Sequence, residues 1–230
     1  MQLPPENSAA RVRVKFGRYV QAKLKRAQLG ELAQTVRAAT DRLKQAARDD
    51  EDQEEAETMA RADRDGVDDI GDEAVQNVRN QLAGRSVRAM REEPYTIIFA
   101  EGVDHYIAAP LDEVDGRLGL LTARLERNLP ADDPALAPTL AAIAQVRTDW
   151  KKAVDELATE RTKGTLTGDA LASATEAWER QLEKTYGALI ERFGRRRAER
   201  FFPRTRRGEV VDEPTPTPAA PPAPADGPMD

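Results

Sequence analysis

Apolar residues recur every three or four positions along most of the chain, a spacing that predicts amphipathic helices. The first two runs lie at 8–48 and 67–91, and proline is absent from residue 11 to residue 93. Such a window favours helix because an interior proline costs about 3 kcal/mol. The apolar positions that define the first helix share one face: Leu29, Leu32, Val36, Ala39, Leu43 and Ala46.

Three further helices are predicted at 111–129, 135–162 and 168–201, with "NLPADDP" and "TKGTLTGD" as the turns between them. Short connections favour antiparallel neighbours. We therefore expect an all-α fold, an antiparallel helical bundle of four to five long helices spanning 8–207, preceded by a disordered N-terminus at 1–7. The narrow apolar faces resemble the seam of a coiled coil, which favours self-association or a partner helix.

Three segments depart from this pattern. Residues 49–66 are strongly acidic with almost nothing to bury, so they form either an acidic linker or a helical extension. Residues 93–110, "EPYTIIFAEGVDHYIAAP", are bounded by prolines and rich in aromatic bulk, and we expect an aromatic connector that plugs one end of the bundle. Residues 208–230 hold seven prolines and no core pattern, which predicts a disordered Pro/Ala-rich tail.

The composition excludes several kinds of chemistry. The 230 residues contain no cysteine, which removes disulfides, thiolate nucleophiles and cysteine-ligated metals. The N-terminus "MQLPPENSAARVRVKF" has no apolar core of a secretion signal. The most apolar run, "PALAPTLAAIAQV", is too short to cross a bilayer. We expect a soluble, cytoplasmic and bacterial protein with no transmembrane segment.

The connector holds the one constellation that resembles a catalytic or metal site. Glu101 and His105 would lie one helical turn apart, with Asp104 beside them, so a carboxylate could orient the imidazole or bind a metal next to it. A single histidine at this spacing lacks the parts of a di-iron bundle, and a structural role is favoured. The acidic run 49–57 lacks the glycine and spacing of a calcium loop. We predict no enzyme, and no catalytic, metal or cofactor site.

Charge is segregated along the chain, although the net charge is only −6. Residues 11–26 carry seven Lys and Arg and no acid, residues 192–207 carry eight Arg and one Glu, and residues 49–73 carry thirteen acids and two Arg. The first block either packs its apolar face in the core, which is favoured, or binds an anionic surface. The second could neutralise phosphates and stack bases on its phenylalanines, complement a helix dipole while Phe193 and Phe201 complete the core, or fold against 49–73.

Our leading hypothesis is a non-enzymatic structural or adaptor protein that acts through protein–protein contacts and self-associates. The alternative is a peripheral binder of an anionic polymer or surface, such as nucleic acid, lipid or a granule, through blocks 11–26 and 192–207. An enzyme built around His105 is the third hypothesis, and no small-molecule substrate is evident. The candidate binding residues are Arg11, Arg18, Lys25, Arg26, Arg195, Arg196, Arg197, Arg200, Arg204, Arg206 and Arg207.

Overall fold

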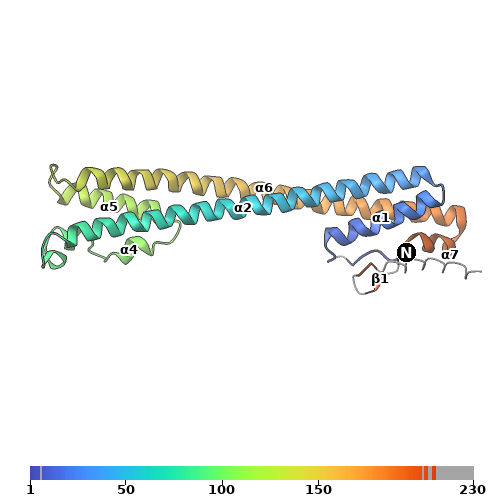
Figure 1. Cartoon of the computed structure of the whole chain (residues 1–230), viewed down its shortest axis with the longest axis horizontal. Helices are drawn as coiled ribbons and strands as arrows, with labels where there is room; N and C mark the ends of the chain where they lie inside the picture. The colour runs from blue at the N-terminus through green and yellow to red at the C-terminus, as the bar shows by residue number, and fades with distance from the viewer. Residues whose placement is uncertain (6, 204, 207–208, 211–230) are drawn as a thin grey trace, which may run out of the picture. The chain divides into compact units, whose positions relative to one another are not determined.

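The computed structural model confirms the all-α class and describes residues 1–5, 7–203, 205–206 and 209–210 (Figure 1). The chain divides into two compact units, and the division falls inside two helices. Unit 1 comprises Met1–Ala47 and Leu171–Asp230, and unit 2 comprises Arg48–Ala170. Each unit has its own hydrophobic core and is described by itself.

Four helices are long: α1 (Ala10–Arg26), α2 (Gly30–Ala83), α5 (Val114–Asn128) and α6 (Leu136–Phe193). The shorter elements are η1 (Ala89–Arg91), α3 (Tyr95–Ile98), α4 (Asp104–Ile107), α7 (Arg195–Ala198) and η2 (Glu199–Phe201). Two short strands, β1 (Thr205–Arg206) and β2 (Glu209–Val210), pair in antiparallel fashion. In the part of the chain described here, no helix is long and apolar enough to cross a membrane.

The single helix predicted at 8–48 is two helices, because α1 ends at Arg26 in a tight turn. Gln28 adopts a left-handed conformation with φ 58°. Its N–H bonds to the Lys25 carbonyl, and the Leu29 N–H bonds to the Leu24 carbonyl at 3.0 Å. This pattern closes a helix C-terminus, and the buried Leu24 and Leu29 supply its usual apolar contact. The sequence conceals the turn because glutamine stands where glycine is common.

The acidic segment 49–66 is a helical extension inside α2, and the turn predicted at "TKGTLTGD" is also helix, inside α6. Polar contacts between the two helices replace the missing apolar ones. The Gln53 amide donates to the Glu160 carboxylate at 2.7 Å, and the Thr167 hydroxyl donates to Asp50 at 3.1 Å. Because residue 50 meets 167 and residue 53 meets 160, these two helix segments run in opposite directions within unit 2.

The core of unit 2 is shared by α2, the connector, α5 and α6. Ile98, Phe99 and Tyr106 of the connector are buried in it, and α3 and α4 both contact α5. The predicted aromatic connector therefore supplies core bulk. Its buried neighbours come from the long helices: Val75, Val78, Leu82, Leu118, Leu121, Leu125, Ile143 and Trp150.

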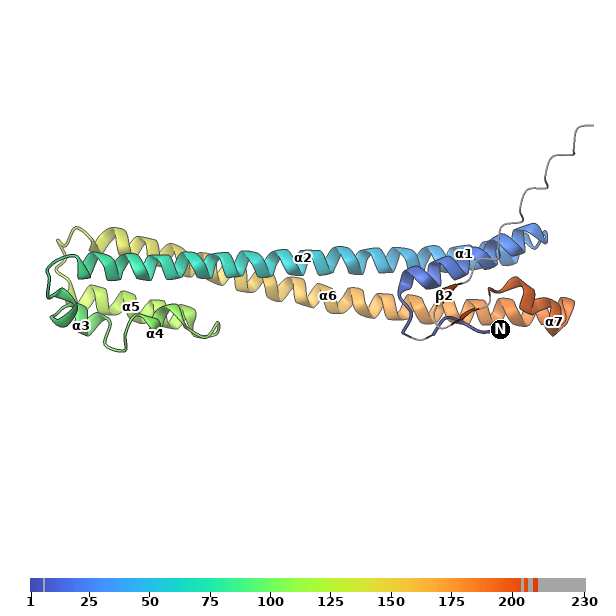
Figure 2. The same cartoon turned by 60° about the horizontal axis from the view of Figure 1, so that its bottom comes forward.

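The core of unit 1 forms where α1 packs on α2 and α6 (Figure 2). Phe16 and Trp178 are fully buried, with ring centroids 6.0 Å apart in an edge-on arrangement. The segment predicted to be disordered at 1–7 contributes as well, because Pro4 is buried and Leu3 packs against this core. The predicted tail at 208–230 lies outside the described residues, apart from the two residues of β2.

Candidate anion-binding surface

The exposed face of α1 carries a row of cations that we call the α1 stripe. Its members are spaced so that they share one side of the helix: Arg11, Lys15, Arg18, Lys25 and Arg26. All five are exposed, and the structure gives none of them an ion pair with another described residue. The opposite face buries Phe16, Val20 and Leu24, which confirms that the apolar face of residues 11–26 packs in the core. The stripe faces solvent because the opposite face of α1 is buried in the core of unit 1.

A second group of cations, the arginine cluster, lies at the end of α6 and on α7 and η2. It consists of Arg192, Arg195, Arg196, Arg197 and Arg200, all exposed. Arg195 pairs with Glu199 at 3.3 Å, which leaves its charge partly neutralised. The guanidinium groups of Arg192 and Arg197 lie over the Phe193 ring, 5.4 and 4.8 Å from its centroid. Such stacking fixes the planar group while leaving its edges free to bind an anion.

The stripe and the cluster belong to the same unit, although about 170 residues separate them in the sequence. η2 contacts α1, and the Phe16 and Phe202 rings lie 6.3 Å apart. Figure 2 shows the C-terminal part of α1 and α7 at the same end of unit 1. Both sequence-predicted blocks therefore belong to unit 1.

The phenylalanines of the second block are structural. Phe201 and Phe202 are buried, and Phe193 is half-buried with its ring stacked on Phe201 at 6.1 Å. Of the two roles that the sequence left open for these rings, core packing is therefore correct for Phe201 and Phe202, and base stacking is not available to them. Any anion must be bound by the arginine head groups.

The three remaining candidates follow the cluster in sequence. Arg204 and Arg207 lie outside the described residues, and Arg206 is part of β1. The structure adds Lys15 and Arg192, which the candidate residues from sequence omitted. Lys15 was detectable from its helical spacing to Arg11 and Arg18, one turn on either side.

The two units carry opposite charge. Unit 1, residues 1–47 and 171–230, holds twenty Lys and Arg against thirteen Asp and Glu, a net charge of +7. Unit 2 holds fifteen Lys and Arg against twenty-eight Asp and Glu, a net charge of −13. Salt screens charges more than about 10 Å apart, so a partner feels the local surface more than the total of −6.

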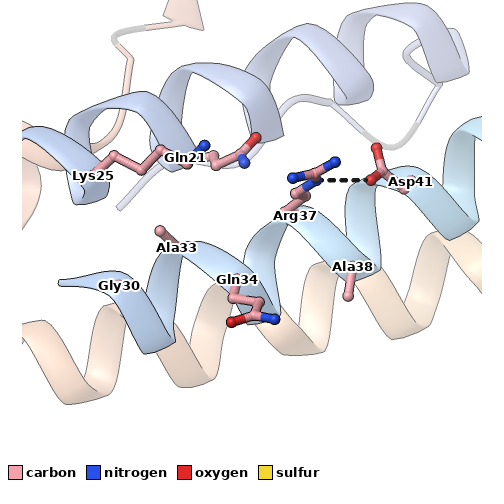
Figure 3. Close-up of a pocket in the computed structure, with 8 residues that line it drawn as sticks. All are labelled: Gln21, Lys25, Gly30, Ala33, Gln34, Arg37, Ala38 and Asp41. Carbon is pink, nitrogen blue, oxygen red and sulfur yellow. Dashed lines mark hydrogen bonds and ion pairs between the residues drawn. The ribbon is translucent and has the colours of Figure 1, made fainter.

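A groove of about 400 Å³ adjoins the stripe between α1 and α2 in unit 1 (Figure 3). Its lining includes the cations Lys25 and Arg37, the latter paired with Asp41 at 3.3 Å. The groove has no nucleophile beside a base, so it supplies shape and positive charge only. Its lining consists of Gln21, Lys25, Gly30, Ala33, Gln34, Arg37, Ala38 and Asp41.

The Glu101, Asp104 and His105 constellation is organised around an arginine of α5. The Arg124 guanidinium donates to both carboxylate oxygens of Glu101, one at 2.7 Å, and to the Tyr106 hydroxyl at 2.9 Å. The Tyr106 hydroxyl in turn donates to the Ile98 carbonyl at 3.0 Å. The backbone carbonyl of His105 accepts a bond from Arg117 of α5. These contacts fasten the connector to α5, and the described residues include no cluster of acids and histidine suited to a metal ion.

We expect Glu101 to stay ionised in acid because its hydrogen bonds from Arg124 lower its pKa to about 2. The sign follows from the unfolded value of 4.5: the ionised pair stabilises the fold above that pH, and its contribution falls as the pH drops toward 2. Carboxyl ¹³C shifts followed by NMR from pH 7 to pH 3 should show Glu101 still ionised. Arg124→Ala should return its midpoint to near the ordinary value.

Arg127→Ala is the matched control for this titration, since Arg127 is exposed one turn further along α5. It should leave the Glu101 midpoint unchanged. A Glu101 that titrates near pH 4.5 in the unsubstituted chain would show that the Arg124 contact does not form.

The chain matches no protein-family model, and no curated protein or solved structure is significantly similar to it.

Proposed function

We propose that the chain is a non-enzymatic adaptor protein that binds the phosphate backbone of nucleic acid through the α1 stripe and the arginine cluster. The observation that carries the proposal is the presence of two sequence-distant basic blocks, with exposed cations on both, in one unit of net charge +7. Binding to the phosphate backbone needs exposed cations and does not need a helix or strand that contacts base edges.

Nucleic acid is favoured over a lipid surface because the apolar face of α1 is not free to enter a membrane. Phe16, Val20 and Leu24 are 0% exposed, whereas an interfacial helix must bury that face in lipid. The stripe from Arg11 to Arg26 extends about 22 Å along α1 at about 1.5 Å per residue. That length corresponds to about six phosphates along one strand of a duplex, spaced about 3.4 Å apart.

The test is the affinity for a fluorescent single-stranded oligonucleotide, measured by anisotropy between 50 and 300 mM salt. With about five phosphate contacts, the plot of log affinity against log salt should have a slope of about −3.5. The triple substitution Arg11→Glu, Lys15→Glu and Arg18→Glu should lower the affinity on the order of a hundredfold, because it removes three contacts and adds repulsion.

The matched control reverses three exposed cations of unit 2, Arg91→Glu, Arg127→Glu and Lys152→Glu. It changes the net charge equally and should alter the affinity severalfold at most. An affinity independent of salt, or an equal loss in both variants, would contradict the proposal. Binding to anionic liposomes without binding to the oligonucleotide would show that the ligand of this surface is a lipid.

Self-association belongs to the same adaptor hypothesis and stays a prediction. The opposite charges of the two units support it, because unit 1 of one copy attracts unit 2 of another. Light scattering by the purified chain at low and high salt decides it.

A further inference from the structure

The part of the chain that follows the basic surface is purely acidic in its charge. From residue 208 to residue 230 there is no Lys or Arg. Residues 211–230 carry four acids in two pairs, Asp212 with Glu213 and Asp226 with Asp230. Between the pairs lies the uncharged stretch "PTPTPAAPPAPA".

This segment follows directly in sequence on a strand that contacts α1. β2 ends at Val210 and contacts α1, the helix that carries the stripe. Twenty residues can extend about 70 Å at most, and the stripe is only about 22 Å long. Every cation of the stripe is therefore within reach of the segment.

We propose that residues 211–230 occupy the α1 stripe when no nucleic acid is bound, so that the chain carries its own competitor for this surface. The five stripe cations lack ion pairs with the described residues, and the four carboxylates provide partners of the opposite charge. The inference rests on the proposed function for the identity of the displaced ligand, but occupancy of the stripe by the segment does not depend on it.

Weak contacts suffice for this occupancy because the segment is tethered. Each exposed ion pair contributes little by itself, but a tether of this length holds the carboxylates at an effective concentration on the order of millimolar. A nucleic acid presents more charges than the four of the segment and displaces it. The cost of that displacement lowers the affinity and reduces its dependence on salt.

The first experiment detects the segment on the stripe with no ligand present. Because the chain has no cysteine, Ala225→Cys gives a single attachment point for a nitroxide label next to Asp226. At 50 mM salt the label should broaden the α1 amide signals between Arg11 and Arg26. Raising the salt to 500 mM should remove the broadening, since it screens the exposed charges.

A neutral-segment variant makes this experiment specific. It combines Asp212→Asn, Glu213→Gln, Asp226→Asn and Asp230→Asn, and it should show no broadening. The matched control, Thr215→Asn with Thr217→Asn, keeps all four charges and should broaden as the parent does. Unaffected α1 signals in the labelled parent at low salt would overturn the proposal. Broadening that grows with protein concentration would also overturn it, by assigning the stripe to a second copy.

The second experiment measures competition with the fluorescent oligonucleotide. At 100 mM salt the neutral-segment variant should bind on the order of tenfold more tightly than the parent, with a steeper salt dependence. Equal affinity of parent and variant would overturn competition for the surface. If the label reports occupancy but neither protein binds the oligonucleotide, the proposed function fails while occupancy of the stripe stands.

Discussion

Replacing Gly17 with alanine is expected to destabilise unit 1 by about 3 kcal/mol, because there is no room for a methyl group where α1 crosses its neighbours. A Cβ atom at Gly17 would lie 2.2 Å from the Thr40 hydroxyl oxygen and 2.9 Å from the Trp178 indole nitrogen. Neither neighbour can retreat, since both side chains are buried. The helix would have to move outward, and Phe16 would lose part of its burial.

Urea unfolding followed by fluorescence can measure this effect in one unit. Unit 1 contains Trp178 and unit 2 contains Trp150, and the chain has no other tryptophan. A Trp150→Phe background therefore reports on unit 1 alone. Gly187→Ala is the matched control in α6 of the same unit, where a Cβ atom would meet nothing within 4 Å. It should be neutral or stabilise by up to about 1 kcal/mol. Equal midpoints for the two variants would show that the close approach at Gly17 does not exist.

Trp178→Ala should cost about 4 kcal/mol of unfolding free energy, the range expected when a large buried aromatic is truncated. Trp178 is 0% exposed and packs edge-on against Phe16. Its indole N–H donates to the Thr40 hydroxyl at 3.2 Å. Truncation therefore removes the largest fully buried side chain and leaves a cavity among α1, α2 and α6.

Thr40→Val separates the hydrogen bond from the packing. Valine keeps the shape but leaves the buried indole N–H without its acceptor, which should cost about 1–3 kcal/mol. Thr35→Val is the control, because Thr35 is exposed on α2 and its hydroxyl bonds only to the Leu32 carbonyl. Circular dichroism follows unfolding in every variant, including those without Trp178. A Thr40→Val loss no larger than that of Thr35→Val would mean that the indole bond contributes nothing.

The helical periodicity predicted the fold class and much of the core, but it misplaced the ends of the long helices. It missed the turn at Gln28 because the left-handed residue there is not a glycine. It also ended two helices too early, at 48 and at 162. The spacing of apolar residues does not predict contacts between polar side chains, such as that of Gln53 with Glu160, which join the two helices here.

The sequence predicted most residues of the candidate surface, but it did not predict how they are arranged in space. Charge counting found both basic blocks, but only the packing of η2 on α1 brings them into one unit. Counting charges also could not assign a role to Phe202. A phenylalanine among arginines is equally compatible with a place in the core and with a surface that stacks bases. Burial at 5% exposure decides for the core.

The division of the chain also dictates the order in which its parts are completed during synthesis. Unit 2 is one uninterrupted stretch of 123 residues inserted between the two halves of unit 1. At about 5–20 residues per second, the ribosome takes about 6–25 s to make it. Throughout that interval the nascent α1 lacks Trp178 and the other core residues of α6, so it can pack only against the N-terminal part of α2. Unit 1 is therefore the last part of the chain to be completed, because the α6 side of its core is made only after the whole of unit 2.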